Sequence, residues 1–150
     1  MMGDPYDLER FVAAQDAGCC YDRAVAELRR GRKQSHWMWF VFPQVAGLGQ
    51  SPASRRFAIC SLAEARAYLA HPVLGPRLAE CTRILAGAPG HDAASMFGGL
   101  DALKLRSSMT LFLRAGPAAA PFGLVLEKYF SGEPDPATDR ILGPASGTGG

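Results

Sequence analysis

Residues Arg32 to Ser51 read RKQSHWMWFVFPQVAGLGQS, and this segment carries more information about the chain than any other. Both tryptophans, Trp37 and Trp39, lie in it, next to two phenylalanines. A block that is apolar on all sides is buried whether it forms a strand or a helix. We favour a helix because the neighbouring segments are helical and no partner strand is apparent, and we expect Pro43 to end or kink it.

Helix start and stop signals fill the rest of the chain. Asp4 is a typical N-cap, with proline at the first helical position. Ser61 and Glu64 form a capping box, and Asp101 caps the longest clear helix. Helical spacing of apolar residues is found at 5–15, 22–30, 52–59, 62–69, 76–86, 92–97, 102–115 and 121–129, with a last turn at 138–142.

These signals predict an all-α protein, because no segment of alternating polarity is paired with a hairpin turn. We expect a single compact domain of about seven to eight helices over residues 4–142. The segment 143–150 is rich in Gly, Ser and Pro, so we expect a disordered tail there. A chain of 150 residues, 48% of them apolar, is sufficient for one domain with a core.

Composition and charge exclude several classes of protein. No apolar run approaches the roughly 20 residues that span a bilayer, and no signal peptide is visible at the N-terminus. The four cysteines show no C-x-x-C spacing, which favours reduced thiols in the cytoplasm over a zinc site. The histidines are dispersed as well, so we expect neither a metal ion nor a cofactor.

A basic run at 29–33 lies next to the aromatic block. Such a run can contact nucleic acid, but it is also typical of a solvated helix end whose charges compensate the helix dipole. The net charge is only +2, so we do not expect a nucleic-acid partner.

Polar residues on both sides of the aromatic block are candidates for chemistry. His36 can act as a general acid or base, because the unperturbed pKa of histidine is about 6.5. Alternatively, His36 bonds a core carbonyl and only orients the block. Gln44 can contact an amide or hydroxyl of a ligand, or it can satisfy loop backbone. Lys33 and Ser35 complete this set.

A Gly-x-Gly turn follows the block. Gly47 and Gly49 would let backbone N–H groups approach an anion, with Ser51 at the start of the next helix. The alternative is an ordinary tight turn in which Ser51 is the N-cap. The pattern is not a dinucleotide-binding motif, since no strand precedes it and no third glycine follows.

The segment 104–110 places polar residues in the middle of an expected helix. Lys104 shares a face with Ser107 and Ser108, beside Arg106. Serine weakens helix interiors, so these residues need an explanation beyond local propensity. One explanation is a functional site, including a Ser–Lys nucleophilic pair. The other is that the hydroxyls bond carbonyls of the preceding turn while Lys104 pairs with Asp101 or Glu127.

Taken together, these motifs closely resemble the bacterial domain of unknown function 1810 family. The resemblance is carried mainly by 32–44, 47–51 and 103–112, and further by 8–15, 64–78 and 129–138. It implies a small, compact, all-helical fold and no established activity. A more distant likeness to the helical NADAR family, which acts on N-glycosidic bonds of ADP-ribose derivatives, carries over no catalytic residue.

Two functional hypotheses follow. The first is a pocket protein that binds a small anionic or nucleotide-like ligand and hydrolyses an N-glycosidic or similar bond. The second is a non-enzymatic helical adaptor that binds a protein partner. For the first, the candidate catalytic residues are His36, Lys104 and Ser108, and the candidate ligand-binding residues are Lys33, Ser35, Trp37, Trp39, Gln44, Gly47, Gly49, Ser51, Arg106 and Ser107. We expect Lys33, His36, Gln44, Lys104, Ser107 and Ser108 to share one cleft lined by Trp37 or Trp39.

Overall fold

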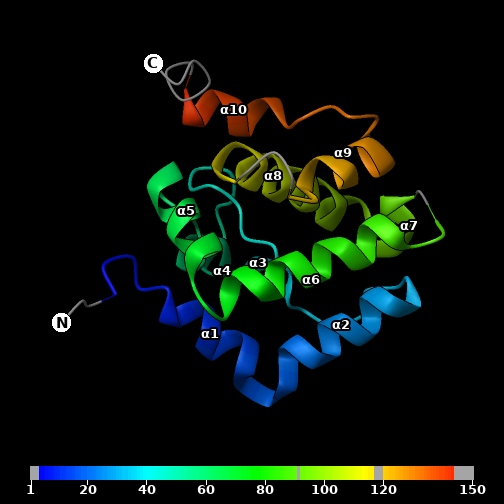
Figure 1. Ribbon diagram of the computed structural model, residues 1–150, viewed down its shortest axis with the longest axis horizontal. Helices are drawn as coiled ribbons and strands as arrows, with labels where there is room; N and C mark the ends of the chain where they lie inside the picture. The colour runs from blue at the N-terminus through cyan, green and yellow to red at the C-terminus, as the bar shows by residue number, and fades with distance from the viewer. Residues whose placement is uncertain (1–3, 91, 117–119, 144–150) are drawn as a thin grey trace.

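The regular elements of the protein are helices (Figure 1). The computed structural model describes residues 4–90, 92–116 and 120–143, and no strand occurs within these ranges. The helices are α1 (Glu9–Asp16), α2 (Cys20–Arg30), α3 (Met38–Val41), α4 (Pro52–Arg56), α5 (Leu62–Ala70), α6 (Leu74–Gly87), α7 (Ala93–Phe97), α8 (Gly99–Ala115), α9 (Phe122–Phe130) and α10 (Pro136–Leu142), with a 3-10 turn at Ala17–Cys19. The all-α prediction is confirmed.

The expected count of seven to eight helices was too low for the described part of the chain. Each of the eight segments with helical spacing contains a helix. The excess comes from α3, inside the aromatic block, and α10, which was expected only as a last turn. Of the expected disordered tail at 143–150, all but Gly143 lies outside the described residues.

Side-chain caps set several helix starts, although not always where the sequence predicts. Ser51 Oγ accepts the Ser54 amide at 3.1 Å and Ser61 Oγ accepts the Glu64 amide at 3.1 Å, so both predicted N-caps are confirmed. Asp4 accepts the amides of Leu8 and Glu9, each at 2.8 Å. However, α1 begins at Glu9 and not after Asp4, because the intervening Asp7 has a φ of 52°, which a right-handed helix does not contain.

The expected helix at 52–59 ends at Arg56, because the chain then becomes extended. Ile59 donates its amide to Gln44 O at 2.9 Å, and Ala46 donates its amide to Ile59 O at 2.8 Å. These bonds form an isolated parallel bridge between Val45 and Ile59. The bridge ties the residues after the aromatic block to those before α5.

Helix α8 is the centre of the fold. It contacts α3, α5, α7, α9 and α10, and α10 covers its outer side (Figure 1). Its inward side chains, among them Leu105, Met109 and Phe112, are fully buried. Helix α6 packs between α2 and α9 and contacts α5. None of the described helices is both long and apolar enough to cross a membrane.

The aromatic block is interior, as expected, but it is only partly helical. Its helix α3 is a single turn that ends at Val41, with Phe42 as the C-cap directly before Pro43. The Trp37 side chain is 1% exposed, and its ring centroid lies 6.2 Å from that of Phe42 and 6.4 Å from that of Phe97. Trp39 is only partly buried, at the edge of the core.

Replacing Trp37 tests this difference in burial. Trp37→Ala should lower the free energy of unfolding by about 3–5 kcal/mol, as expected for the loss of a large core side chain. Trp39→Ala, the matched control, should cost less because its ring already contacts solvent. Chemical denaturation monitored by circular dichroism measures both. Equal losses would contradict the burial described here.

Candidate functional site

The aromatic segment is anchored by the carboxylate of Glu27, a residue of α2. Its side chain is 2% exposed. Oε1 accepts the amide of Gln34 at 2.7 Å, the amide of Ser35 at 2.9 Å and the indole N–H of Trp37 at 2.9 Å. Oε2 accepts the Ser35 hydroxyl at 2.6 Å. The segment from Gln34 to Trp37 is therefore wrapped around one buried charge.

These hydrogen bonds keep Glu27 ionised. Burial alone disfavours the charge and raises the pKa, but the hydrogen bonds from Ser35, Gln34 and Trp37 outweigh it and lower the pKa from its ordinary 4.5 to about 2. Glu27 was not among the candidates from the sequence. The available signal was its position on the face of α2 that carries Ala24 and Leu28, where a charged residue must have a partner.

Lys33 and Lys104, both expected at the site, do converge. Lys33 Nζ lies 2.9 Å from Asp101 Oδ2, and Lys104 Nζ lies 3.2 Å from Asp101 Oδ1. Each ammonium also lies 5.1 Å from the centroid of an indole ring, Lys33 over Trp37 and Lys104 over Trp39. We call Lys33, Asp101 and Lys104 the lysine–aspartate cluster.

In the cluster one carboxylate pairs with both lysines, and the group is not an open binding site. The Lys33 side chain is only 8% exposed, and it also donates to Ser35 O at 2.6 Å. Partial burial opposes ionisation of Asp101, yet the two lysines lower its pKa below the ordinary value. The cluster joins α8 to the segment that precedes the aromatic block.

His36 and Gln44 lie apart from the cluster. His36 is exposed and lines a hollow of about 410 Å³ together with Cys20 and Arg23. Gln44 lines a separate hollow of about 240 Å³ with Gly47 and Gly49. The structure therefore does not bring the six expected side chains into one cleft.

The Gly-x-Gly turn has a structural explanation. Gly47 has a φ of 102°, and a Cβ on Gly49 would lie 2.4 Å from Ser54 Oγ. Glycine is required at both positions for the turn itself. Ser51 is the N-cap of α4, so this part of the segment matches the tight-turn alternative.

Two polar residues in the middle of α8 hold the connection between α9 and α10. Arg106 donates to Glu133 O at 2.9 Å and to Pro134 O at 3.0 Å. Ser107 Oγ donates to Asp135 Oδ2 at 2.9 Å and also bonds Leu103 O, in the preceding turn. This second bond is the alternative considered from the sequence, and the first adds a tertiary reason for the serine.

Ser108 differs from its neighbours. It is fully buried, and its hydroxyl has no hydrogen-bond partner within the described ranges. The indole N–H of Trp39 is likewise buried and has no hydrogen-bond partner within the described ranges. Lys104 Nζ bonds Asp101 and not Ser108, so the structure contains no Ser–Lys hydrogen bond in this described helix.

Metal binding by cysteine or histidine has no support in the part of the chain that the structure describes. In residues 4–90, 92–116 and 120–143, no three His, Cys, Asp or Glu side chains are grouped so that they could hold a metal ion. All four cysteines are free thiols. Burial raises the pKa of the Cys81 thiol to about 12, so this thiol is not a nucleophile at neutral pH.

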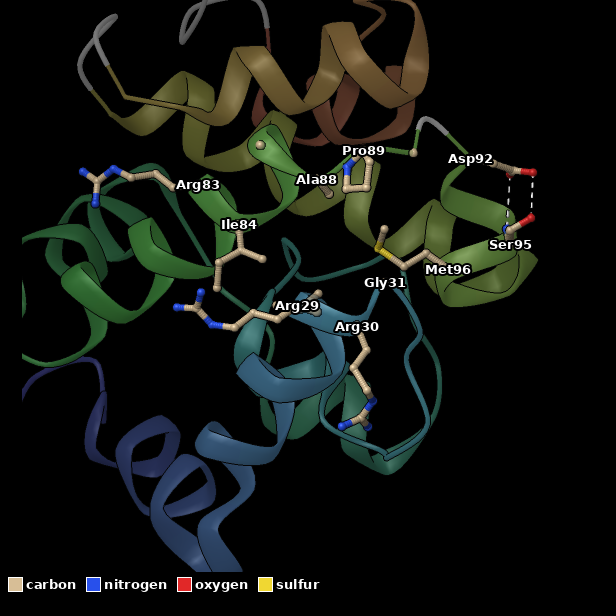
Figure 2. Close-up of a pocket in the computed structure, with 13 residues that line it drawn as sticks. Arg29, Arg30, Gly31, Arg83, Ile84, Ala88, Pro89, Asp92, Ser95 and Met96 are labelled. Carbon is tan, nitrogen blue, oxygen red and sulfur yellow. Dashed lines mark hydrogen bonds between the residues drawn. The ribbon is translucent and has the colours of Figure 1, made fainter.

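A further hollow lies between α2, α6 and α7 (Figure 2). It has a volume of about 650 Å³. We call it the arginine pocket. Its lining residues are Leu28, Arg29, Arg30, Gly31, Arg83, Ile84, Gly87, Ala88, Pro89, Gly90, Asp92, Ser95 and Met96. Sequence reasoning considered Arg29 and Arg30 only as a basic run, and it did not consider Arg83.

The charge of the arginine pocket is unbalanced. Three arginines line it against one carboxylate, Asp92. Arg29 lies 3.7 Å from Glu80 outside the lining, and Arg30 donates to Gln34 at 3.3 Å. The side chain of Arg83 has no hydrogen bond or ion pair to any residue that the structure describes.

Arg29 and Arg30 lie in the last turn of α2, where their charges compensate the helix dipole, as the solvated-end alternative for the basic run predicts. Arg83 is not needed to compensate the end of α6. Lys128, on α9, donates to Ala86 O at 3.1 Å and also to Ala88 O, so it already neutralises these terminal carbonyls. The pocket is also tied to the aromatic segment, because the Met96 carbonyl accepts the Lys33 amide at 2.8 Å. A shift of the backbone at Lys33 would therefore also move Met96, which lines the arginine pocket.

The comparisons with known proteins agree with this architecture. The family model described as "Protein of unknown function (DUF1810)" matches residues 5–142. The crystal structure of the conserved hypothetical protein Rv1873 from Mycobacterium tuberculosis is similar, with a TM-score of 0.89 and 52% identity over 93% of this chain and 98% of that chain. No curated protein matches the chain.

Glu27→Gln tests the anchor. Near neutral pH the substitution should cost about 2–4 kcal/mol, because the glutamine amide points an N–H₂ group at donors that need an acceptor. The folded pKa is lowered, so the stabilisation by Glu27 is complete above about pH 4.5 and is lost as the pH falls towards about 2. Urea titrations of both proteins between pH 2.5 and 7 measure the difference.

The control for this prediction is Glu127→Gln, since Glu127 is exposed on α9. It should leave the free energy of unfolding nearly unchanged. A stability difference between Glu27→Gln and the wild type that does not shrink on acidification would contradict the assignment.

Asp101→Asn tests the lysine–aspartate cluster. It should destabilise the protein by about 1–3 kcal/mol, because Lys33 loses the counter-charge of a nearly buried ammonium. Lys104→Met should cost less, since the Lys104 side chain is 26% exposed. Thermal denaturation of both variants shows which loses more stability. A larger loss for Lys104→Met would contradict the proposal that Asp101 stabilises the charge of Lys33.

Proposed function

The chain belongs to the DUF1810 family, and we propose that it binds a small anionic, nucleotide-like molecule in the arginine pocket. The observation that carries this proposal is the composition of the described lining, which combines three arginines and one carboxylate with apolar side chains. Ligand pockets typically combine a mostly apolar wall with a few polar groups that orient the ligand. Arginine suits phosphate and carboxylate because its planar guanidinium donates two parallel hydrogen bonds.

The size of the pocket supports a small molecule. Its volume of about 650 Å³ lies within the range of roughly 300–1,000 Å³ that is usual for ligand sites. The net charge is only +2. A nucleic-acid partner is therefore not part of the proposal, whereas a cytoplasmic location is, in keeping with the free cysteines.

The proposal for the arginine pocket is ligand binding, without a defined reaction. Hydrolysis of an N-glycosidic or similar bond needs a general base or a nucleophile beside the ligand. The candidate catalytic residues His36, Lys104 and Ser108 are not among the residues that line the arginine pocket. Asp92 is the carboxylate of the described lining, so a hydrolytic step in this pocket would depend on Asp92.

The alternative function is a helical adaptor that binds a protein partner. One observation favours it: Leu100 and Leu103 are 77% and 59% exposed. They are three residues apart on α8 and therefore lie on the same face. Under this hypothesis the arginine pocket would bind no small molecule, and the Leu100→Ser/Leu103→Ser double variant would lose a partner that the wild type retains.

A thermal-shift screen followed by calorimetry tests the ligand-binding proposal. Nucleoside phosphates, ADP-ribose and sugar phosphates are the probes, and one present at 100 times its Kd should stabilise the protein by about 2.7 kcal/mol. Arg83→Gln should weaken the binding of the best probe by roughly tenfold or more, since it removes charge-assisted hydrogen bonds.

Arg66→Gln is the matched control. Arg66 is exposed on α5 and does not line the pocket, so this variant should bind as the wild type does. The proposal fails if none of these anions binds, or if Arg83→Gln and Arg66→Gln have the same affinity.

A further inference from the structure

One histidine joins three helices. His71 follows the last residue of α5 and precedes α6, and its side chain also reaches α1. Its Nδ1 accepts the amides of Val73 and Leu74 at 3.1 and 3.2 Å, and its Nε2 lies 3.3 Å from Glu9 Oε2. We infer that His71 is a protonation switch: the neutral imidazole holds the first turn of α6 in place, and a second proton on the ring releases it.

The hydrogen bonds define which nitrogen of the ring carries the hydrogen. A backbone N–H is only a donor, so Nδ1 must present a lone pair to Val73 and Leu74. The hydrogen of the neutral ring is then on Nε2, directed at the Glu9 carboxylate. An imidazolium cannot make the same contacts, because both of its nitrogens are donors.

The two amides that His71 accepts lie at the start of α6, where helical N–H groups have no intrahelical acceptor. A proton on Nδ1 would face both of them. Positive charge is also unfavourable at a helix N-terminus, because the helix dipole is positive there. The backbone leaves little room for adjustment: Gly75 donates its amide to His71 O at 3.1 Å, and a Cβ on Gly75 would collide with Leu69 O. The charged ring and the first turn of α6 must therefore separate.

Two carboxylates favour the charged ring and oppose this separation. Glu9 lies beside Nε2, and Asp4 interacts with His71 electrostatically. Both are weak opponents, because the Glu9 side chain is 67% exposed and Asp4 is exposed as well, so water and salt screen their attraction. Asp4 also accepts the amides of Leu8 and Glu9.

The other charges of the adjoining helices form pairs of their own. Arg10 of α1 lies 3.1 Å from Glu64 of α5, and Arg77 of α6 lies 2.9 Å from Asp16 of α1. Within the described ranges, the state of the imidazole is therefore governed by two amides on one side and two carboxylates on the other. Histidine changes its charge between about pH 5 and 8, so the switch operates in that window.

Amide hydrogen exchange followed by NMR tests the switch. After correction for the pH dependence of chemical exchange, the protection of the Val73 and Leu74 amides should fall roughly tenfold or more between about pH 7.5 and 5.5, because both amides lose their acceptor. The amides of Leu105 and Met109, in the buried part of α8, are the reference and should change much less.

His71→Asn is the informative variant. An asparagine oxygen accepts amides at a helix start whatever the pH, so the protection of Val73 and Leu74 should become independent of pH in this window. His36→Asn is the matched control. His36 is exposed and lies in the segment between α2 and α3, so this variant should keep the pH dependence of the wild type.

The nitrogen chemical shifts of the His71 ring provide a second measurement, which needs only the wild type. Near neutral pH they should show a neutral ring with its hydrogen on Nε2, and a hydrogen on Nδ1 would overturn the inference. Unchanged or increased protection at the lower pH would also overturn it, since the Glu9 and Asp4 carboxylates would then hold the charged ring in place. An equal loss of protection in His71→Asn and the wild type would show that another group is responsible.

Discussion

The structure depends most on the buried carboxylate of Glu27. A charge placed inside a protein is unfavourable unless it is fully hydrogen-bonded, and Glu27 is bonded by two amides, a hydroxyl and an indole N–H. These four donors all come from the segment between Gln34 and Trp37. The chain must therefore pass around Glu27 in one conformation, and this places Trp37 in the core and Lys33 beside Asp101.

Polar side chains of helix α8 also fix the positions of the segments that pack against it. Asp101 holds the two lysines near its start, and Arg106 and Ser107 hold the segment before α10. The polar residues of the motifs at 32–44 and 103–112 thus mostly bond to other residues of the protein. The arginine pocket differs because one of its cations, the Arg83 side chain, has no partner within the described chain, which is why the proposed function is placed there and not at the aromatic block.

The fold was largely predictable from the sequence, and the site was not. Ser51 and Ser61 act on amides three residues away, so local reasoning located these helix starts. The start of α1 was misplaced because the conformation of Asp7 has no signature in the sequence. Lys33 and Lys104 were correctly expected to meet, but His36 was grouped with them only because it is close in sequence, and it lies in a different hollow.

Composition, caps and apolar spacing were enough to establish an all-α chain and an interior aromatic block, because both follow from interactions within a few residues. The partners of Glu27, the position of Asp101 between two lysines and the presence of Arg29 and Arg83 in the lining of one hollow depend on how distant helices pack. Arg29 and Arg83 belong to α2 and α6, which contact each other only in the folded protein. No local pattern encodes that contact, since burial and packing of whole faces determine it.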